Sequence, residues 1–470
     1  MKIQLNKVYP HLLKNGLNLT RTSSNVIQIT GNGELPVDIL LPENFELEKE
    51  AVQQLIDFAH FTSPHGEKVK CACATPDFHK GTTIPVGSVV VTSHDLVIPS
   101  AIGTDINCGM RLHSLGLTLD QFLSKKKELL HLLKGDLLEG TRDLPTTNKA
   151  MQAMFTNGLY GFWEEMKKTP KGIFANINYE KVENEVFKLH GSAFLLGDSQ
   201  YAPENLMNRD WMRDPSLGTL GGSNHFMELQ VVKEIVDRKK AYELGIKVGD
   251  VMGMVHTGSR DVGFYVGGHW MDRAKEAFPK DKKHPANKTF ALEGELAHEY
   301  IKAMTSAAHY ATTNRALISE LVRQRVVQLF GQDNNHLITD VPHNIVIKED
   351  IGNVHRKGAT PAYKDELLLI PGSMGHDSYL LSGMGNTKWL QSASHGAGRS
   401  YSRNEISFKG KKDKKMLGLE GVECITLKEE RMIEEAPGAY KEIGPVIQSQ
   451  VEEGTVNVIA VFSPLVTFKA

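Results

Sequence analysis

The sequence has little of what marks several large classes of protein. It contains only four cysteines, too few for the disulfide framework of a small secreted domain. No apolar run approaches the ~20 residues that a helix needs to cross a bilayer. Residues 1–16 lack the apolar stretch of a signal peptide. We therefore expect a cytoplasmic protein with no membrane partner, whose cysteines stay reduced: Cys71, Cys73, Cys108 and Cys424.

The chain also lacks a dominant charge. Lys and Arg number 54 and Asp and Glu number 56, which gives a net charge of −2. A chain so balanced has no overall preference for polyanions, so any nucleic-acid site must be a local patch. Glycine and proline, at 42 and 19 of 470 residues, stay far below their share in low-complexity chains. The composition is that of a globular protein with a large core.

Hydrophobic periodicity predicts both helices and strands. A 3.6-residue spacing predicts helices over 51–61, 119–135, 146–167 and 291–331, the last with a single apolar stripe. Runs of β-branched residues predict strands over 86–92, 226–232, 344–348, 366–370 and 456–462. Because the two kinds of element do not alternate regularly, we expect an α+β fold with a mixed β core surrounded by helices.

Two segments stand apart from this pattern. Residues 136–217 are the least patterned part of the chain, and we expect an insertion or a cap there. The run KGKKDKK at 409–415 reads as a turn-like basic loop, more readily a solvated surface loop than a binding patch.

Glycine-rich or turn-like segments that hold a His, Cys or Asp are the informative feature. Asp105 and Cys108 lie three residues apart in one such loop, so both side chains can turn to one point. A carboxylate and a thiolate, joined by imidazoles, suit a borderline divalent transition ion, and a thiolate can bridge two ions. The candidate imidazoles are His225, His256 and His343. The alternative is that Cys108 is a small buried hydrophobe and Asp105 a turn cap.

A second kind of site is indicated by SHGAGR at 394–399. Small residues around His395 let a phosphate approach, and backbone N–H groups with Arg399 can hold its oxygens. A neutral histidine nitrogen is a good nucleophile towards phosphorus. The alternative is a glycine-rich turn with a solvent-exposed histidine.

The motifs together resemble those of the RtcB-type RNA ligases, also called tRNA-splicing ligases. The elements that carry the resemblance occur in the family's order: PDFHKG (76–81), DINCGM (105–110), GGSNHF (221–226), HTGSR (256–260), HN (343–344), RKGAT (356–360), PGSMG (371–375), HGAGR (395–399) and Lys469. The resemblance implies one large catalytic domain over 1–470 and is weakest over 136–217.

The resemblance implies an enzyme that joins an RNA 3′-phosphate or 2′,3′-cyclic phosphate to a 5′-hydroxyl, using GTP and two Mn²⁺ ions. Cys108 would bridge the ions, His256 and His343 would complete one site, and Asp105 and His225 the other. His395 would take up GMP. The guanylate pocket would be formed, besides His395, by Asn224, Phe226, Glu228, Pro371, Gly372, Ser373, Met374, Ser378, Gly396, Ala397, Gly398, Tyr440 and Lys469.

Contacts with RNA phosphates are expected from Arg260, Asn344 and Arg399. Local positive charge also makes candidates of Arg356, Lys357, Arg403 and 409–415. Asp77 and His79 belong to the first motif without an assigned step. The sequence names no protein partner.

The chain departs from the family pattern at His309, His376 and Asp377, and we expect these residues to border the pocket and shift nucleotide or RNA-end preference. The same motifs leave open a dinuclear metal phosphodiesterase or phosphatase that does not use His395, and a non-catalytic protein that binds RNA ends. They also leave open whether such a ligase would serve tRNA splicing or RNA repair.

Overall fold

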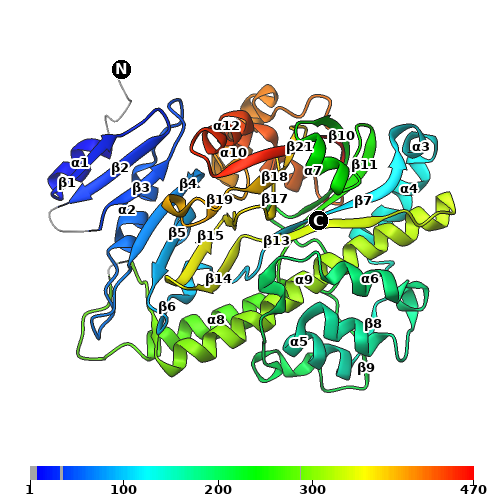
Figure 1. Ribbon diagram of the computed structural model, residues 1–470, viewed down its shortest axis with the longest axis horizontal. Helices are drawn as coiled ribbons and strands as arrows, with labels where there is room; N and C mark the ends of the chain where they lie inside the picture. The colour runs from blue at the N-terminus through cyan, green and yellow to red at the C-terminus, as the bar shows by residue number, and fades with distance from the viewer. Residues whose placement is uncertain (1–7, 32–34, 286) are drawn as a thin grey trace.

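Two β-sheets form the centre of the fold (Figure 1), which a computed structural model describes over residues 8–31, 35–285 and 287–470. Within these residues one sheet has seven strands, in the order β1-β2-β3-β4-β5-β15-β14. Its strands are β1 (Leu17–Arg21), β2 (Val26–Gly31), β3 (Val37–Leu40), β4 (Cys71–His79), β5 (Val86–Thr92), β15 (Gly352–Lys357) and β14 (Asn344–Glu349). Only β3 and β4 pair in parallel; the other pairs are antiparallel.

The second sheet has eight strands within the described residues. Seven follow the order β13-β7-β11-β10-β21-β18-β17, and β20 pairs in parallel with β21. The strands are β13 (His336–Pro342), β7 (Gly109–Thr118), β11 (Asp250–Thr257), β10 (Phe226–Ile235), β21 (Val456–Lys469), β18 (Ser378–Gly383), β17 (Leu367–Ile370) and β20 (Cys424–Thr426). Short pairs are β6 (Leu96–Val97) with β12 (Leu292–Glu293), β8 (Pro145–Thr147) with β9 (Trp211–Arg213), and β16 (Ala359–Pro361) with β19 (Ser392–Ser394).

Helices surround the sheets, as Figure 1 shows, and the predicted α+β class is confirmed. They are α1 (Val8–Lys14), α2 (Lys49–Ala59), α3 (Leu119–Ser124), α4 (Lys126–Lys134), α5 (Asn148–Met166), α6 (Tyr179–Val186), α7 (Arg238–Glu243), α8 (Arg260–Glu276), α9 (Glu295–Phe330), α10 (Arg403–Lys412), α11 (Glu429–Glu434) and α12 (Ile443–Glu452).

The long helix α9 lies between the second sheet and α5 (Figure 1), and every residue from Ala303 to Arg323 is buried. The single apolar stripe predicted for it was therefore too narrow. Its polar side chains are buried because they bond to the strands and loops on all sides; Arg315 and Asn314 are examples. Buried polar groups usually find partners, although the hydroxyls of Tyr300 and Thr313 on the same helix make no hydrogen bond within the described residues.

Most predicted elements lie within a few residues of the observed ones, and two differences have local causes. The helix predicted over 119–135 is two helices, because Lys125 has a non-helical backbone (φ −131°) between α3 and α4. The helix predicted from 291 begins at Glu295, because β12 pairs with β6 and Gly294 then turns with φ +58°.

The segment 136–217 carries α5, α6 and the β8–β9 pair, and it covers one side of α9. Edge-to-face contacts among Phe162, Trp163 and Phe174, with ring centroids 5.2–6.4 Å apart, form part of its core. The weak sequence pattern therefore hid a well-packed helical layer.

The prediction of a basic loop at 409–415 was wrong. Residues up to Lys412 complete α10, which starts with a capping box between Ser402 and Glu405, and a short 3₁₀ turn follows. Lysines at the end of a helix favourably face its negative dipole end, which explains a cluster that the sequence alone presents as a turn.

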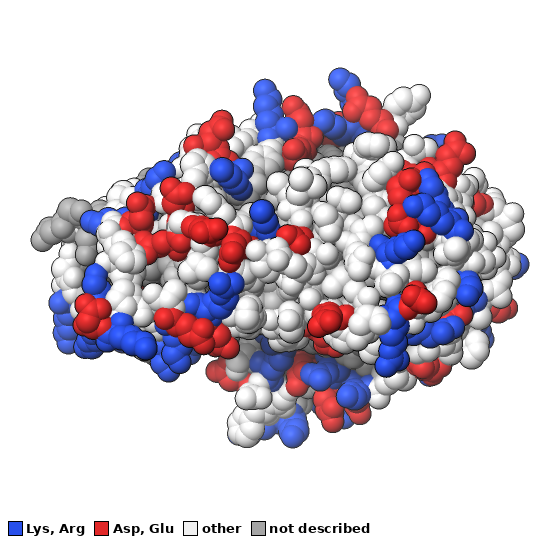
Figure 2. Space-filling view, turned by 90° about the horizontal axis from the view of Figure 1, so that it is seen from below, with Lys and Arg blue, Asp and Glu red and all other residues white. Residues whose placement is uncertain are grey.

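Charge is mixed on the surface. On the face drawn in Figure 2, Lys and Arg side chains alternate with Asp and Glu around a broad uncharged area, in keeping with the near-zero net charge. None of the helices in the described ranges is both long and apolar enough to cross a membrane.

Candidate active site

Four neighbouring strands of the second sheet place five chemically active side chains at the same end of the sheet. The strands β13, β7, β11 and β10 are antiparallel neighbours, so the start of one meets the end of the next. The five are Asp105 and Cys108 just before β7, His225 before β10, His256 near the end of β11 and His343 after β13.

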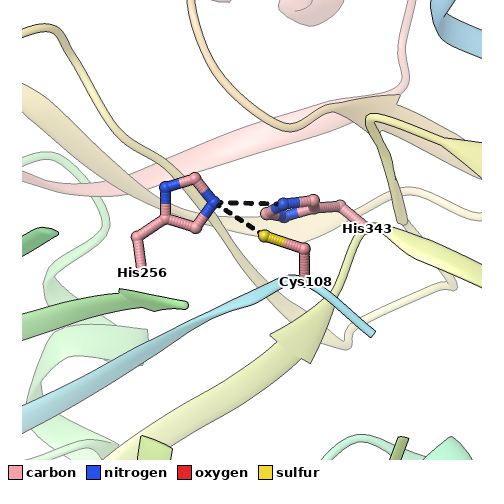
Figure 3. Close-up of side chains that lie close together, drawn as sticks. All are labelled: Cys108, His256 and His343. Carbon is pink, nitrogen blue, oxygen red and sulfur yellow. Dashed lines mark hydrogen bonds between the residues drawn. The ribbon is translucent and has the colours of Figure 1, made fainter. Parts of the chain in front are cut away.

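The structure brings these five side chains into contact. The Cys108 Sγ lies 3.3 Å from His225 Nε2 and 3.2 Å from His256 Nε2. His256 Nε2 lies 3.2 Å from His343 Nε2, and Figure 3 shows the two rings turned towards each other beside the thiol. Asp105 Oδ2 lies 3.0 Å from His225 Nε2. The donor atoms form two groups that share Cys108, each compact enough to hold a metal ion.

The residues fit a pair of transition-metal ions. His256 Nδ1 lies 3.1 Å from the main-chain oxygen of Asn224, which orients the ring with Nε2 towards the cluster. Burial lowers the pKa of His256 and His343 well below the usual value, so both rings are neutral, as ligands must be. Burial raises the pKa of the Cys108 thiol, and metal binding would remove that proton.

A buried arginine holds the ligand segments together. The Arg315 guanidinium binds the Asp340 carboxylate at 2.7 Å and donates to the main-chain oxygens of Asn107 (2.7 Å) and Thr257 (3.0 Å). Asn107 precedes Cys108, Thr257 follows His256, and Asp340 lies three residues before His343. Arg315 therefore connects the segments that carry three of the candidate ligands. At Gly258 a side chain would collide with the Asp105 carboxylate, which explains the glycine.

His395 lies beside the metal-ligand cluster. Its ring centroid is 4.7 Å from that of His343, and its Nδ1 lies 2.6 Å from Asp77 Oδ2. The buried Asp77 also accepts from the His395 main-chain N–H (3.1 Å) and from Thr75 Oγ1 (2.5 Å). Burial opposes ionisation of Asp77, but His395 and these hydrogen bonds outweigh it and lower its pKa.

An ionised Asp77 can only accept, so Nδ1 of His395 carries a proton, and in the neutral ring Nε2 has the lone pair. The sequence reasoning assigned no step to Asp77; its contact depends on Gly398, where a side chain would collide with the Asp77 backbone. Motif PDFHKG held the signal, but only the fold shows what Asp77 faces.

A cavity of about 1130 Å³ opens beside these groups. Most residues predicted for the site line it: Asp105, Cys108, Asn224, Phe226, Glu228, His256, His343, Asn344, Pro371, Gly372, Ser373, Met374, His395, Gly396, Ala397, Gly398, Arg399, Tyr440 and Lys469. His225 lies behind Asp105 and Cys108, and Ser378 lies behind the wall, where it accepts from Gln230 and Gly372. The sequence reasoning missed Glu48 and Glu50, which also line the cavity.

A buried carboxylate and a buried lysine mark one wall. Glu228 accepts from Gln230 Nε2 at 2.7 Å and from the Thr467 hydroxyl, and burial raises its pKa to about 7. Lys469 donates to the main-chain oxygen of His225 at 3.1 Å. This wall can therefore recognise a group with paired N–H donors and an adjacent negative charge.

An aromatic and two arginines line the cavity near Lys469. The Arg399 guanidinium lies 4.9 Å from the Tyr440 ring centroid and binds Glu435 at 3.2 Å. Arg403 binds the other oxygen of Glu435 at 2.8 Å and reaches Ser223 Oγ. Glu435 thus aligns two cationic groups at the mouth of the cavity.

The predicted phosphate contacts divide into three kinds. Arg356 is fully buried and bonds to Ser392 and Glu349, so the expectation that it contacts RNA was wrong. Lys357 lines the cavity, whereas Arg260 does not and instead bonds to Thr219. Asn344, which also lines it, donates to the Asp105 main-chain oxygen.

The three residues that depart from the family pattern differ in their position relative to the cavity. His309 lies in the α5–α9 contact, with Nδ1 3.2 Å from the Phe155 oxygen, and it does not line the cavity. Asp377 binds Lys233 and Ser463 outside the cavity. The expectation that His309 borders the pocket was wrong. Asp377 lies next to the cavity through its main-chain oxygen, which is close to the lining residue Gly372, and His376 contacts the lining residue Ser373 at 2.6 Å.

A donor set for metal ions next to an imidazole oriented by a carboxylate, both facing one cavity, is the arrangement of an enzyme active site. The chain belongs to the RtcB family, whose model, described as tRNA-splicing ligase RtcB, matches residues 58–470.

The chain is similar to named members of this family from distant organisms. It is 32% identical to the tRNA-splicing ligase RtcB of Pyrobaculum aerophilum, over 81% of this chain and 83% of the relative. The tRNA-splicing ligase RtcB of Aeropyrum pernix is 29% identical, over 84% and 87%. The RNA-splicing ligase RtcB homolog 2 of Entamoeba dispar is 30% identical, over 84% and 80%.

Proposed function

We propose that the protein is an RNA ligase that joins a 3′-phosphate or 2′,3′-cyclic phosphate end to a 5′-hydroxyl end, with GTP and two Mn²⁺ ions, in tRNA splicing or RNA repair. The single observation that carries this proposal is the His395 imidazole, held at Nδ1 by Asp77 and lying 4.7 Å from the ligand His343. A metal hydrolase needs no such oriented nucleophile, whereas guanylate transfer does. Family membership supports the same activity.

In the first step, His395 Nε2 attacks the α-phosphorus of GTP; an N–P bond forms and pyrophosphate leaves. The ring gains positive charge as this bond forms, and the Asp77 carboxylate at Nδ1 stabilises it. An oxygen of the RNA 3′-phosphate then takes GMP from His395, which gives an RNA(3′)pp(5′)G end. The 5′-hydroxyl of the second RNA attacks the 3′-phosphorus, loses its proton and displaces GMP. A cyclic end must first be hydrolysed to the 3′-phosphate.

Cys108 would be shared by the two ions, with His256 and His343 on one and Asp105 and His225 on the other. Bound metal would supply Lewis-acid polarisation of phosphate oxygens. Asn344 and Arg399, which line the cavity, are proposed to hold RNA phosphates, and Arg260 to add positive charge beside them.

The guanine is proposed to lie against Glu228, whose carboxylate can accept from the ring N–H and the amino group. Lys469 and Ser373 would face the nucleotide from the same wall, and Tyr440 offers a face for stacking. Asn224, Phe226 and the 371–374 and 396–398 segments would enclose it.

The affinity for GTP should decrease as the pH is lowered below 7. The pKa of Glu228 is raised to about 7, so at lower pH the carboxyl is protonated and loses an acceptor for the guanine. We expect GTP affinity to fall by up to about tenfold for each pH unit below 7. The measurement is calorimetric titration at pH 6, 7 and 8, with Glu228→Gln titrated in parallel to cancel the pH dependence of metal binding. An equal pH response in both proteins would contradict the assignment.

The function is tested by supplying RNA oligonucleotides with a 3′-phosphate and a 5′-hydroxyl, together with GTP and Mn²⁺. A joined product that retains the 3′-phosphate as the new linkage, with GMP released, is expected. Free phosphate without joining would favour a metal phosphatase instead. Binding of the ends without either product would indicate a non-catalytic RNA-binding protein.

A further inference from the structure

One lysine outside the cavity lining joins the two segments that carry the proposed nucleophile and its partner. One is 76–81, the bulged end of β4 and the residues after it (the Asp77 loop), and the other is 395–399 (the His395 loop). Lys441 Nζ donates to the main-chain oxygen of Phe78 at 2.7 Å, one residue after Asp77. Its own main-chain N–H donates to Gly398 O at 2.9 Å, in the loop that begins with His395. A single residue thus fixes the spacing between the Asp77 loop and the His395 loop.

The ammonium group of Lys441 is buried, and burial disfavours its charged form. Burial lowers its pKa to about 8, while Asp77 and Glu48 favour its charged form. Its Nζ lies 5.4 Å from the Phe45 ring centroid, a distance compatible with a cation–π contact. The acceptor of its hydrogen bond is a carbonyl rather than a carboxylate, so the contact fixes the backbone in place rather than neutralising a charge.

The same segment is also held by residues of the N-terminal part of the chain, before residue 58, where the family match begins. The Gln54 amide makes two bonds with Gly81, donating to its oxygen at 2.9 Å and accepting from its N–H at 3.1 Å. Glu48 accepts from the Lys80 N–H at 2.9 Å. The segment 76–81 is therefore held by Glu48 and Gln54 as well as by Lys441.

We propose that Lys441 is a positioning residue for guanylate transfer: it holds the Asp77 loop against the His395 loop so that the carboxylate stays on Nδ1 while Nε2 attacks. This inference rests on the proposed function. The geometry is demanding, since a shift of about 1 Å in a catalytic group can lower a rate by about 10²-fold. The nearby positive charge also disfavours transfer of the Nδ1 proton to Asp77.

The experiment measures the rate at which the protein takes up label from α-labelled GTP with Mn²⁺, as a function of GTP concentration. Lys441→Met should lower the maximal rate by about 10- to 100-fold and leave the GTP concentration for half-maximal rate within about twofold, because Lys441 does not line the cavity. Lys441→Arg keeps a charged donor and should recover most of the rate. Lys188→Met is the matched control, because its Nζ also donates to a carbonyl, that of Leu337, outside the site.

The outcomes separate the two proposals. A folded Lys441→Met with the wild-type rate, or with only a changed GTP dependence, overturns the positioning role while the proposed function stands. Equal losses in folded Lys441→Met and Lys441→Arg also overturn it. Absence of label on the wild-type protein overturns both. If Lys441→Met does not fold, Gln54→Ala decides, because it removes another tie on the same segment, at Gly81: an unchanged rate rejects the positioning role of these ties.

Discussion

Replacing Cys108 with alanine should abolish metal binding and self-guanylylation together. Its Sγ is the one donor shared by both ligand groups and lies 3.2–3.3 Å from two imidazole nitrogens. Loss of a residue that merely supports a ligand commonly costs 10- to 100-fold in metal affinity, so loss of the shared ligand should cost at least about 100-fold. The measurement is the Mn²⁺ content after loading and dialysis, followed by the labelling assay.

Cys73→Ala is the matched control, because Cys73 is also a buried cysteine but lies on β4, outside both ligand groups. It should keep its full metal content. A Cys108→Ala protein that retains both ions would show that the thiol is only a packing residue.

Replacing His395 with asparagine should remove GMP uptake and leave the metal content unchanged. No nitrogen lone pair would remain at the position of Nε2, so labelling should fall by at least about 10³-fold, to background. The five metal ligands do not include His395, which is why the ions should stay. Labelled GTP, acid-labile and alkali-stable protein label, and metal analysis of the same sample test both statements.

His269→Asn serves as its control, since His269 is exposed on α8 and should label normally. Full labelling of His395→Asn would mean that another side chain carries the nucleotide. The pair of variants is informative because Cys108→Ala loses both properties and His395→Asn only one.

Although residue order alone could not show that the five candidate ligand side chains meet, their residue types and the resemblance to the RtcB family allowed their proximity to be predicted. The groups that each motif faces across the cavity could not be predicted in this way. Asp77 belongs to the first motif, yet its partner His395 is 318 positions away. Likewise Arg356 looks like a phosphate contact in RKGAT, but its strand points it into the core, towards Ser392.

The helices and strands that were not predicted from the sequence were missed for similar reasons. Helix α8 was missed although Val262, Val266, Trp270 and Ala274 recur at four-residue intervals, because glycines dilute its pattern. The strands β1, β2 and β3 are short, and their order in the sheet depends on long-range pairing that periodicity does not report. Helix α10 was hidden by its lysines, which look like a turn until the capping box at Ser402 is considered.

The route of the chain through the ligand cluster has a consequence for how the protein matures. Its donors lie in or beside strand ends and are separated by up to 238 positions along the chain, from Asp105 to His343, and Arg315 ties them together only once α9 has docked. Contacts so distant in sequence form late, because the intervening chain must be ordered first. We therefore expect ions to load after the second sheet has assembled, and fragments that end before His225, which complete neither ligand group, should remain metal-free. Metal occupancy would then serve as a gauge of the correctly assembled fraction in any preparation.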